Sequence, residues 1–112
     1  MIHKDKCLEL GLPEPASFDN QQTYVIKVIV TGIRFNTRMA RYIGIHNLHS
    51  IAPILKKKGY DFTLQREQVK CPFTGKVPPY SVDVLSMTTE QLTHYQKEKA
   101  YSGLTKADFP IN

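Results

Sequence analysis

The stretch ARYIGIHNLHSIAPILKKKGY, residues 40–60, decides the fold. It opens inside a predicted helix over residues 37–43, with Asn36 as N-cap and an apolar face that includes Ala40 and Ile43. Gly44 ends this helix and makes a tight turn. The small side chain of Ala40 lets a second helix approach, so two helices joined by a short turn are expected.

The second helix is predicted over residues 46–58, because Leu48, Ile51 and Leu55 repeat at helical spacing. Pro53 removes one backbone hydrogen bond, so either the helix kinks there or its regular part begins near Pro53. Three lysines at positions 56–58 complement the dipole at the end of the helix, and Gly59 follows them as its cap.

On the N-terminal side, a helix is predicted from about residue 20 to Gly32, capped by Ser17 or Asp19, although its β-branched residues also permit a strand. A very short strand follows at residues 33–35. On the C-terminal side, alternation over residues 60–71 predicts a strand with a bulge, and residues 72–76 form a turn. A returning strand at residues 80–84 completes a hairpin tipped by Lys70 and Lys76.

The two ends of the chain differ from this middle part. Residues 1–18 contain Gly11, Pro13 and Pro15 and are expected to form a loosely attached N-terminal arm. Residues 88–112 are expected to hold a C-terminal helix that starts at a Thr88 capping box, runs to about Tyr101 and is followed by a tail. The central domain therefore spans residues 19–87.

Element order and charge point to one class of protein. The predicted order, three helices with a short strand and a β-hairpin, is that of an α+β winged helix-turn-helix domain, here with an added C-terminal helix. Residues 27–80 carry ten basic side chains against two acidic ones, a net charge of +8, whereas the flanking segments carry −2 and −1. Such a concentrated basic block favours a polyanionic partner, and double-stranded DNA fits the element order.

The segment from about residue 24 to residue 87 resembles a family of small winged helix-turn-helix proteins found mainly in bacteriophages and prophages. The matching pieces are Ala40, Gly44, Leu48 and Leu55-Lys56-Lys57-Lys58-Gly59-Tyr60, whereas Pro53 departs from the pattern. The resemblance implies a DNA-binding protein with a regulatory or phage-recombination role, and it specifies no target. It fits a small transcriptional regulator.

Candidate DNA-contacting residues follow from this arrangement. The start of the second helix would face base edges, because amide, hydroxyl and imidazole groups can bind them; its candidates are His46, Asn47, His49 and Ser50. Asn47 has an alternative role as a helix cap, and the two histidines as ordinary surface residues. Phosphate contacts are expected from Arg38, Arg41, Lys56, Lys57 and Lys58. Phosphate or minor-groove contacts are expected from the wing residues Arg66, Lys70 and Lys76.

Other classes of function find little support. The sequence has no Gly-rich phosphate loop, nucleophile elbow or HExxH motif, so it is not expected to be an enzyme or to need a cofactor. Cys71-Pro72-Phe73-Thr74-Gly75 is similar to half of a zinc knuckle, but Cys71 has no ligand partner at a short spacing, and no metal is expected. With two cysteines, no signal peptide and no membrane span, we expect a cytoplasmic protein.

Two rival functions remain on the sequence alone. A small phage protein with this fold can instead bind a host protein and inhibit or recruit it, and a basic surface does not distinguish that role from DNA binding. An architectural protein that binds DNA without sequence preference is a third interpretation. The C-terminal helix could also support a homodimer, but its apolar stripe is thin, so a monomer is an equal alternative.

Overall fold

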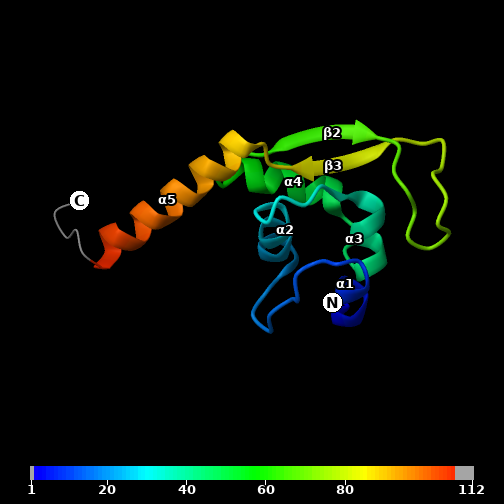
Figure 1. The fold of residues 1–112 in the computed structure, drawn as a ribbon, viewed down its shortest axis with the longest axis horizontal. Coiled ribbons are helices and arrows are strands. Elements are labelled where there is room, and N and C mark those ends of the chain that lie inside the picture. The colour runs from blue at the N-terminus through cyan, green and yellow to red at the C-terminus, as the bar shows by residue number, and fades with distance from the viewer. Residues whose placement is uncertain (1, 108–112) are drawn as a thin grey trace.

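The computed structural model describes the backbone of residues 2–107 and the side chains of residues 2–98. Within these limits the chain forms an α+β domain with five helices and a three-stranded antiparallel sheet (Figure 1). The elements in order are α1 (Lys4–Glu9), α2 (Gln21–Ile29), β1 (Phe35–Asn36), α3 (Thr37–Ile43), α4 (Leu48–Lys57), β2 (Thr63–Glu67), β3 (Val82–Ser86) and α5 (Thr89–Ala107). Helix α5 extends away from the rest of the domain.

The sheet has the order β1-β3-β2, so the last strand in sequence lies in the middle. Leu85 of β3 is fully buried and lies opposite Phe35 of β1 and Leu64 of β2. The helices α2, α3 and α4 share one core with β3, because their apolar faces and Leu85 all belong to a single buried cluster.

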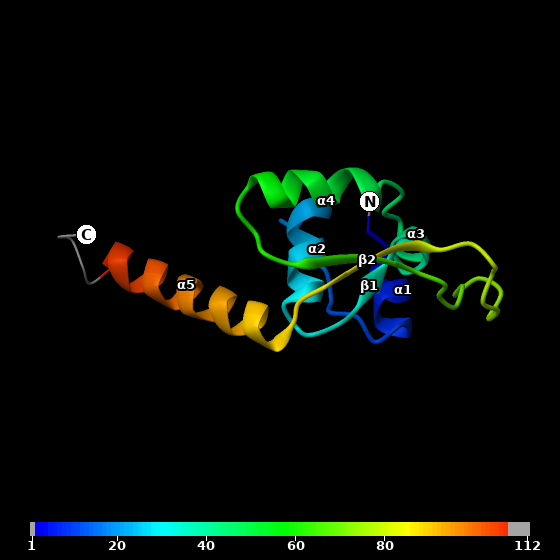
Figure 2. The same ribbon diagram turned by 90° about the horizontal axis from the view of Figure 1, so that it is seen from above.

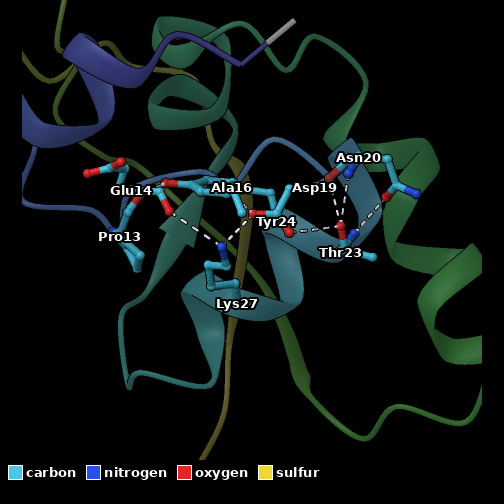
Figure 3. A network of polar contacts seen from close by, with 8 residues as sticks. All are labelled: Pro13, Glu14, Ala16, Asp19, Asn20, Thr23, Tyr24 and Lys27. Carbon is cyan, nitrogen blue, oxygen red and sulfur yellow. Dashed lines mark hydrogen bonds and ion pairs between the residues drawn. The ribbon is translucent and has the colours of Figure 1, made fainter.

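Helix α2 is a helix and not a strand, as its periodicity predicted. Tyr24, Val25, Val28 and Ile29 are all fully buried, which is the pattern of one helical face. The N-cap is Asn20, and neither Ser17 nor Asp19. Its side chain accepts a hydrogen bond from the Thr23 N–H at 2.8 Å, and the Thr23 hydroxyl accepts one from the Asn20 N–H (Figure 3).

Asp19 has a different role from the predicted cap. Its carboxylate accepts a hydrogen bond from the Ala16 N–H at 2.8 Å and forms an ion pair with Lys27 (Figure 3). The hydrogen bond that Lys27 donates, together with the bond from Ala16 and the charge of Lys27, holds the pKa of Asp19 below its usual value. The same part of the domain is fixed by Tyr24, whose hydroxyl donates to the Pro13 carbonyl at 2.6 Å. The segment before α2 is therefore attached to it by side chains as well as by the chain.

The helix pair predicted around Gly44 is confirmed in its main features. Asn36 caps α3 by accepting a hydrogen bond from the Met39 N–H at 2.9 Å. Gly44 ends the helix in the left-handed conformation, with φ of 104°. Helix α4 begins at Leu48, two residues later than predicted, and runs through Pro53 without a break. His49, whose carbonyl loses its usual partner because of Pro53, is exposed, so water can satisfy it.

The prediction of a loosely attached N-terminal arm is wrong. Residues 4–9 form α1, which packs against α3, and Cys7 and Leu12 are buried in the core, with 0 % and 4 % of their surface exposed. The His3 N–H also donates to the carbonyl of Ile43 at 2.7 Å. The glycine and prolines that suggested a mobile arm instead shape a turn, with φ of 75° at Gly11, which returns the chain to α2.

Further boundaries differ from the prediction, including those of the short strand and the returning strand, which lie at Phe35–Asn36 and Val82–Ser86 and not at residues 33–35 and 80–84. The predicted bulged strand over residues 60–71 is shorter and has no bulge, because pairing runs without interruption from Thr63 to Glu67 and residues 68–71 belong to a long loop over residues 68–81. Helix α5 has the predicted capping box, in which Thr88 and Gln91 bond each other's N–H at 3.1 and 2.9 Å. It continues past Tyr101 and Gly103 to Ala107. Phe109 and Ile111, the large apolar residues at the end of the predicted tail, lie outside the described residues.

Candidate nucleic-acid interface

The first turn of α4 presents the polar side chains that the sequence assigned to base contacts. His46, Asn47, His49 and Ser50 are all exposed. Leu48 and Ile51, which alternate with them, are buried at 1 % and 2 % exposure and hold this turn against the core. The four polar residues therefore share one outward surface on a fixed scaffold (Figure 2 shows α4 along one side of the domain).

Asn47 is the N-cap residue of α4, but its side chain makes no capping hydrogen bond. Only its backbone carbonyl takes part, accepting from the N–H groups of Ser50 and Ile51 at 2.9 and 3.1 Å. The alternative in which Asn47 serves as a side-chain cap is thus excluded. The amide group has one oxygen acceptor and two N–H donors available for a ligand.

The centre of the same surface carries two apolar residues that sequence reasoning did not assign to it. Pro53 is exposed, and 39 % of Ile54 is exposed. Ile54 is apolar and lies next to Leu55 in the sequence, but it is not part of the buried face of α4. Its exposure has a signal in the sequence, because position 54 lies outside the repeat of positions 48, 51 and 55 that forms the buried face of the helix.

The three lysines at the end of α4 have different environments. Lys56 donates to the Phe62 carbonyl and lies over the Phe62 ring, 4.2 Å from its centroid. Lys58 donates to the side-chain oxygen of Gln22 at 2.7 Å. Lys57 is exposed, and within the described part of the chain it has no hydrogen bond or ion pair. Lys57 is the lysine of this group that is most available to a phosphate.

The two arginines of α3 also differ. Arg41 is exposed, whereas Arg38 is half-buried and its Nε atom is buried without a hydrogen-bond partner among the described residues. Arg38 lies close enough to Cys71 for its positive charge to lower the pKa of the thiol. Burial raises the pKa of Cys71, but hydrogen bonds from Thr74 and Phe73 and the charge of Arg38 outweigh it, so the net pKa is lowered. Arg41 is therefore the stronger phosphate candidate.

The loop between β2 and β3 is folded on itself and joined to the helices. The Lys76 carbonyl accepts from the Cys71 N–H at 2.7 Å, which closes a tight turn. Phe73 in this turn packs edge-on against Tyr42 of α3, with ring centroids 5.0 Å apart. Lys70 and Lys76 are exposed at this turn. Arg66 at the base of the loop is occupied, since it binds Asp83 at 3.0 Å and the Ser81 carbonyl at 2.9 Å.

Helices α3 and α4 carry basic side chains and no acidic ones, and Glu9 of α1 contributes a carboxylate that accepts a hydrogen bond from Tyr42 of α3. Residues 20–60 contain no aspartate or glutamate. Of the ten basic residues in positions 27–80, three form ion pairs with carboxylates in the described structure: Lys27, Arg34 and Arg66. The other seven have no acidic partner within the described part of the chain. Most of this positive charge is thus not neutralised internally.

The structure brings together no metal site at the residues considered for zinc. Among the described residues there is no group of three His, Cys, Asp or Glu side chains that could hold a metal ion. Cys7 and Cys71 are both buried and unbonded to each other. No helix within the described residues combines the length and the apolar character needed to cross a membrane.

Comparison of the chain with protein-family models, curated proteins and solved structures gave no match.

Proposed function

We propose that this chain is a winged helix-turn-helix protein that binds double-stranded DNA. The order α2, β1, α3, α4, β2, β3 is the order of elements in that fold. In this assignment α3 and α4 are the helix-turn-helix, with Gly44 in its turn, and the loop over residues 68–81 is the wing. Helices α1 and α5 are additions at the two ends.

The uncommitted side chain of Asn47 carries the proposal. An exposed N-cap asparagine would ordinarily bond the first turn of its helix, because that bond satisfies a backbone N–H. Here the amide stays available at the end of α4 that would enter the major groove. An asparagine amide can bind the N6 and N7 atoms of adenine together, and Ile54 further along the same surface could contact a thymine methyl group.

The basic residues supply the second part of the proposal. Arg41, Lys57, Lys70 and Lys76 are exposed and are available to phosphates. Contacts of this kind give affinity and orientation but no sequence preference. We propose on this basis a small regulator that selects its site through α4 and holds the backbone through α3, α4 and the wing.

A protein partner is the second candidate, and the apolar centre of α4 favours it. Pro53 and Ile54 are exposed side by side, and apolar residues at the centre of a surface are typical of protein interfaces. DNA is the better match because Lys57 on the same helix is exposed and residues 20–60 contain no acidic side chain. A host protein would have to be strongly acidic to fit.

The test is fluorescence anisotropy with random duplex DNA at low salt, followed by selection of preferred sequences. We expect saturable binding and enrichment of one sequence. Asn47→Ala should lower affinity for the selected sequence by about tenfold or more, the effect of one lost bidentate contact, while affinity for random duplex changes little. Gln96→Ala, which removes an exposed polar side chain from α5, is the matched control.

Each other outcome has a definite meaning. Binding without enrichment would indicate an architectural protein that binds any duplex. Absence of binding at low salt, where electrostatic attraction is strongest, would overturn the DNA proposal and favour a protein partner.

A further inference from the structure

The wing carries an exposed apolar ridge that the proposed contacts do not use. The ridge is the segment Val77-Pro78-Pro79-Tyr80, on the return side of the loop. Val77 and Tyr80 are 57 % and 73 % exposed, and Pro79 is also exposed. Exposed apolar side chains that lie close together in sequence in this way are typical of a surface that a partner covers.

The ridge is held in place by the rest of the loop. The side chain of Gln68 donates to the Pro79 carbonyl at 3.0 Å across the loop, and Arg66 donates to the Ser81 carbonyl at 2.9 Å. The two prolines also restrict the backbone of the ridge. A segment that already has a fixed conformation loses little conformational entropy on binding. Such a segment is suited to insertion into a narrow site of a partner.

The charge around the ridge selects the ligand. Residues 68–81 contain two lysines, Lys70 and Lys76, and no acidic residue. The acids nearest in sequence, Glu67 and Asp83, are each paired with an arginine. The loop lies at the end of the molecule opposite α5, where it can reach beyond the helices (Figures 1 and 2). An apolar segment next to free lysines matches the minor groove of duplex DNA better than a neutral protein surface.

We propose that this ridge inserts into the minor groove as a wedge and bends the DNA, an activity that rests on the proposed duplex binding. Proteins that bend DNA in this way place an apolar or proline side chain between base pairs and partly unstack them. Lys70 and Lys76 would hold the flanking phosphates while Val77 and the adjacent prolines occupy the base step. The wing would then bend the duplex, which phosphate contacts from its lysines alone would not do.

The experiment measures circularisation of a short duplex by DNA ligase, together with anisotropy on the same duplex. A linear duplex of about 120 bp, shorter than the DNA persistence length of about 150 bp, closes slowly unless it is bent. We expect the wild-type protein to raise the circularisation rate by about fivefold or more at saturating protein. Val77→Ser should remove most of this increase and leave affinity within about threefold, since phosphate contacts dominate affinity.

Leu8→Ser is the matched control. Leu8 is an aliphatic residue of α1 with 53 % exposure, close to the 57 % of Val77. This variant should keep both binding and circularisation. Thermal melting of both variants checks that the exposed substitutions leave the fold intact.

The proposal and the proposed function fail in different ways. If the wild-type protein binds the duplex but does not accelerate circularisation, bending is excluded while DNA binding stands. If Val77→Ser retains full circularisation, or loses affinity and circularisation in equal proportion, the ridge is not a wedge. If the wild-type protein does not bind the duplex at low salt, both proposals fall and the ridge becomes a candidate protein-docking surface.

Discussion

The proposed DNA binding predicts a definite dependence on salt, because the structure shows which basic side chains are engaged within the protein and which are not. Seven basic residues in positions 27–80 have no acidic partner among the described residues; of these, Lys56 and Lys58 are hydrogen-bonded within the protein and Arg38 is half-buried. The four that remain are Arg41, Lys57, Lys70 and Lys76. Each phosphate neutralised steepens the log–log dependence of affinity on salt by about 0.9, so four contacts give a slope of about −3.6.

The same reasoning gives the size of the effect. Raising KCl from about 50 mM to about 200 mM should weaken binding by about 150-fold if the slope is about −3.6. If all ten basic residues of the block contacted phosphate, the slope would instead be about −9. Anisotropy titrations of one labelled duplex across a series of KCl concentrations distinguish these values.

Single substitutions test the assignment residue by residue. Lys57→Gln should make the slope shallower by about 0.9, because it removes one phosphate contact. Lys97→Gln removes an exposed lysine of α5, outside the proposed interface, and should leave the slope unchanged. Equal effects of the two variants would refute the reasoning, since binding would then depend on net charge and not on the surface of α3, α4 and the wing.

Three further predictions concern the fold and its thiols. Asn36→Ala should destabilise the protein by about 1 kcal/mol in urea unfolding, because Asn36 caps α3. Ionised Asp19 stabilises the fold through its ion pair with Lys27, and its pKa is lowered in the folded state. This stabilisation is therefore present above the usual pKa of 3.8 and is lost as the pH falls below it. Asp19→Asn should lower the free energy of unfolding at neutral pH and should lower it progressively less below about pH 3.8, as measured by acid unfolding. Iodoacetamide should modify Cys71, whose pKa is lowered, faster than Cys7, whose pKa is raised by burial, and mass spectrometry of the folded and denatured protein measures both.

Local signals in the sequence predicted the elements that depend on local chemistry. The Asn36 cap, the Gly44 turn and the Thr88 capping box all involve residues within four positions of one another. Such bonds form from the chain's own geometry, so the residue types are sufficient to predict them. The order of elements followed from the same signals and from hydrophobic spacing.

The errors arose where distant residues decide the outcome. Gly11, Pro13 and Pro15 indicated a loosely attached arm over residues 1–18, yet Cys7 is fully buried against a cluster built by helices far along the chain. Val69 and Cys71 alternate like strand residues, but the loop folds back to α3 through Phe73 and Tyr42. Tertiary contacts overrode local preference in both cases.

The candidate site shows the same division at finer scale. The lysines of positions 56–58 look equivalent in the sequence, and only the positions of Phe62 and Gln22 show that two of them are engaged. The residue types predicted that this region is basic, because the net charge of a segment follows from its sequence alone. It could not predict which charges are free, because that depends on what the fold places beside them.

The two asparagines that precede helices show why the interface itself could be only half predicted. Asn36 has the extended backbone of an N-cap, with ψ of 168°, and its side chain reaches the first turn of α3. Asn47 has ψ of 41°, and its side chain makes no such bond. Since Ile45 and Leu48 on either side are buried, the packing of the turn into the core sets the backbone at Asn47. The side chain of Asn36 therefore caps a helix, whereas that of Asn47 makes no capping bond. Burial of the neighbouring residues sets the backbone conformation that causes this difference.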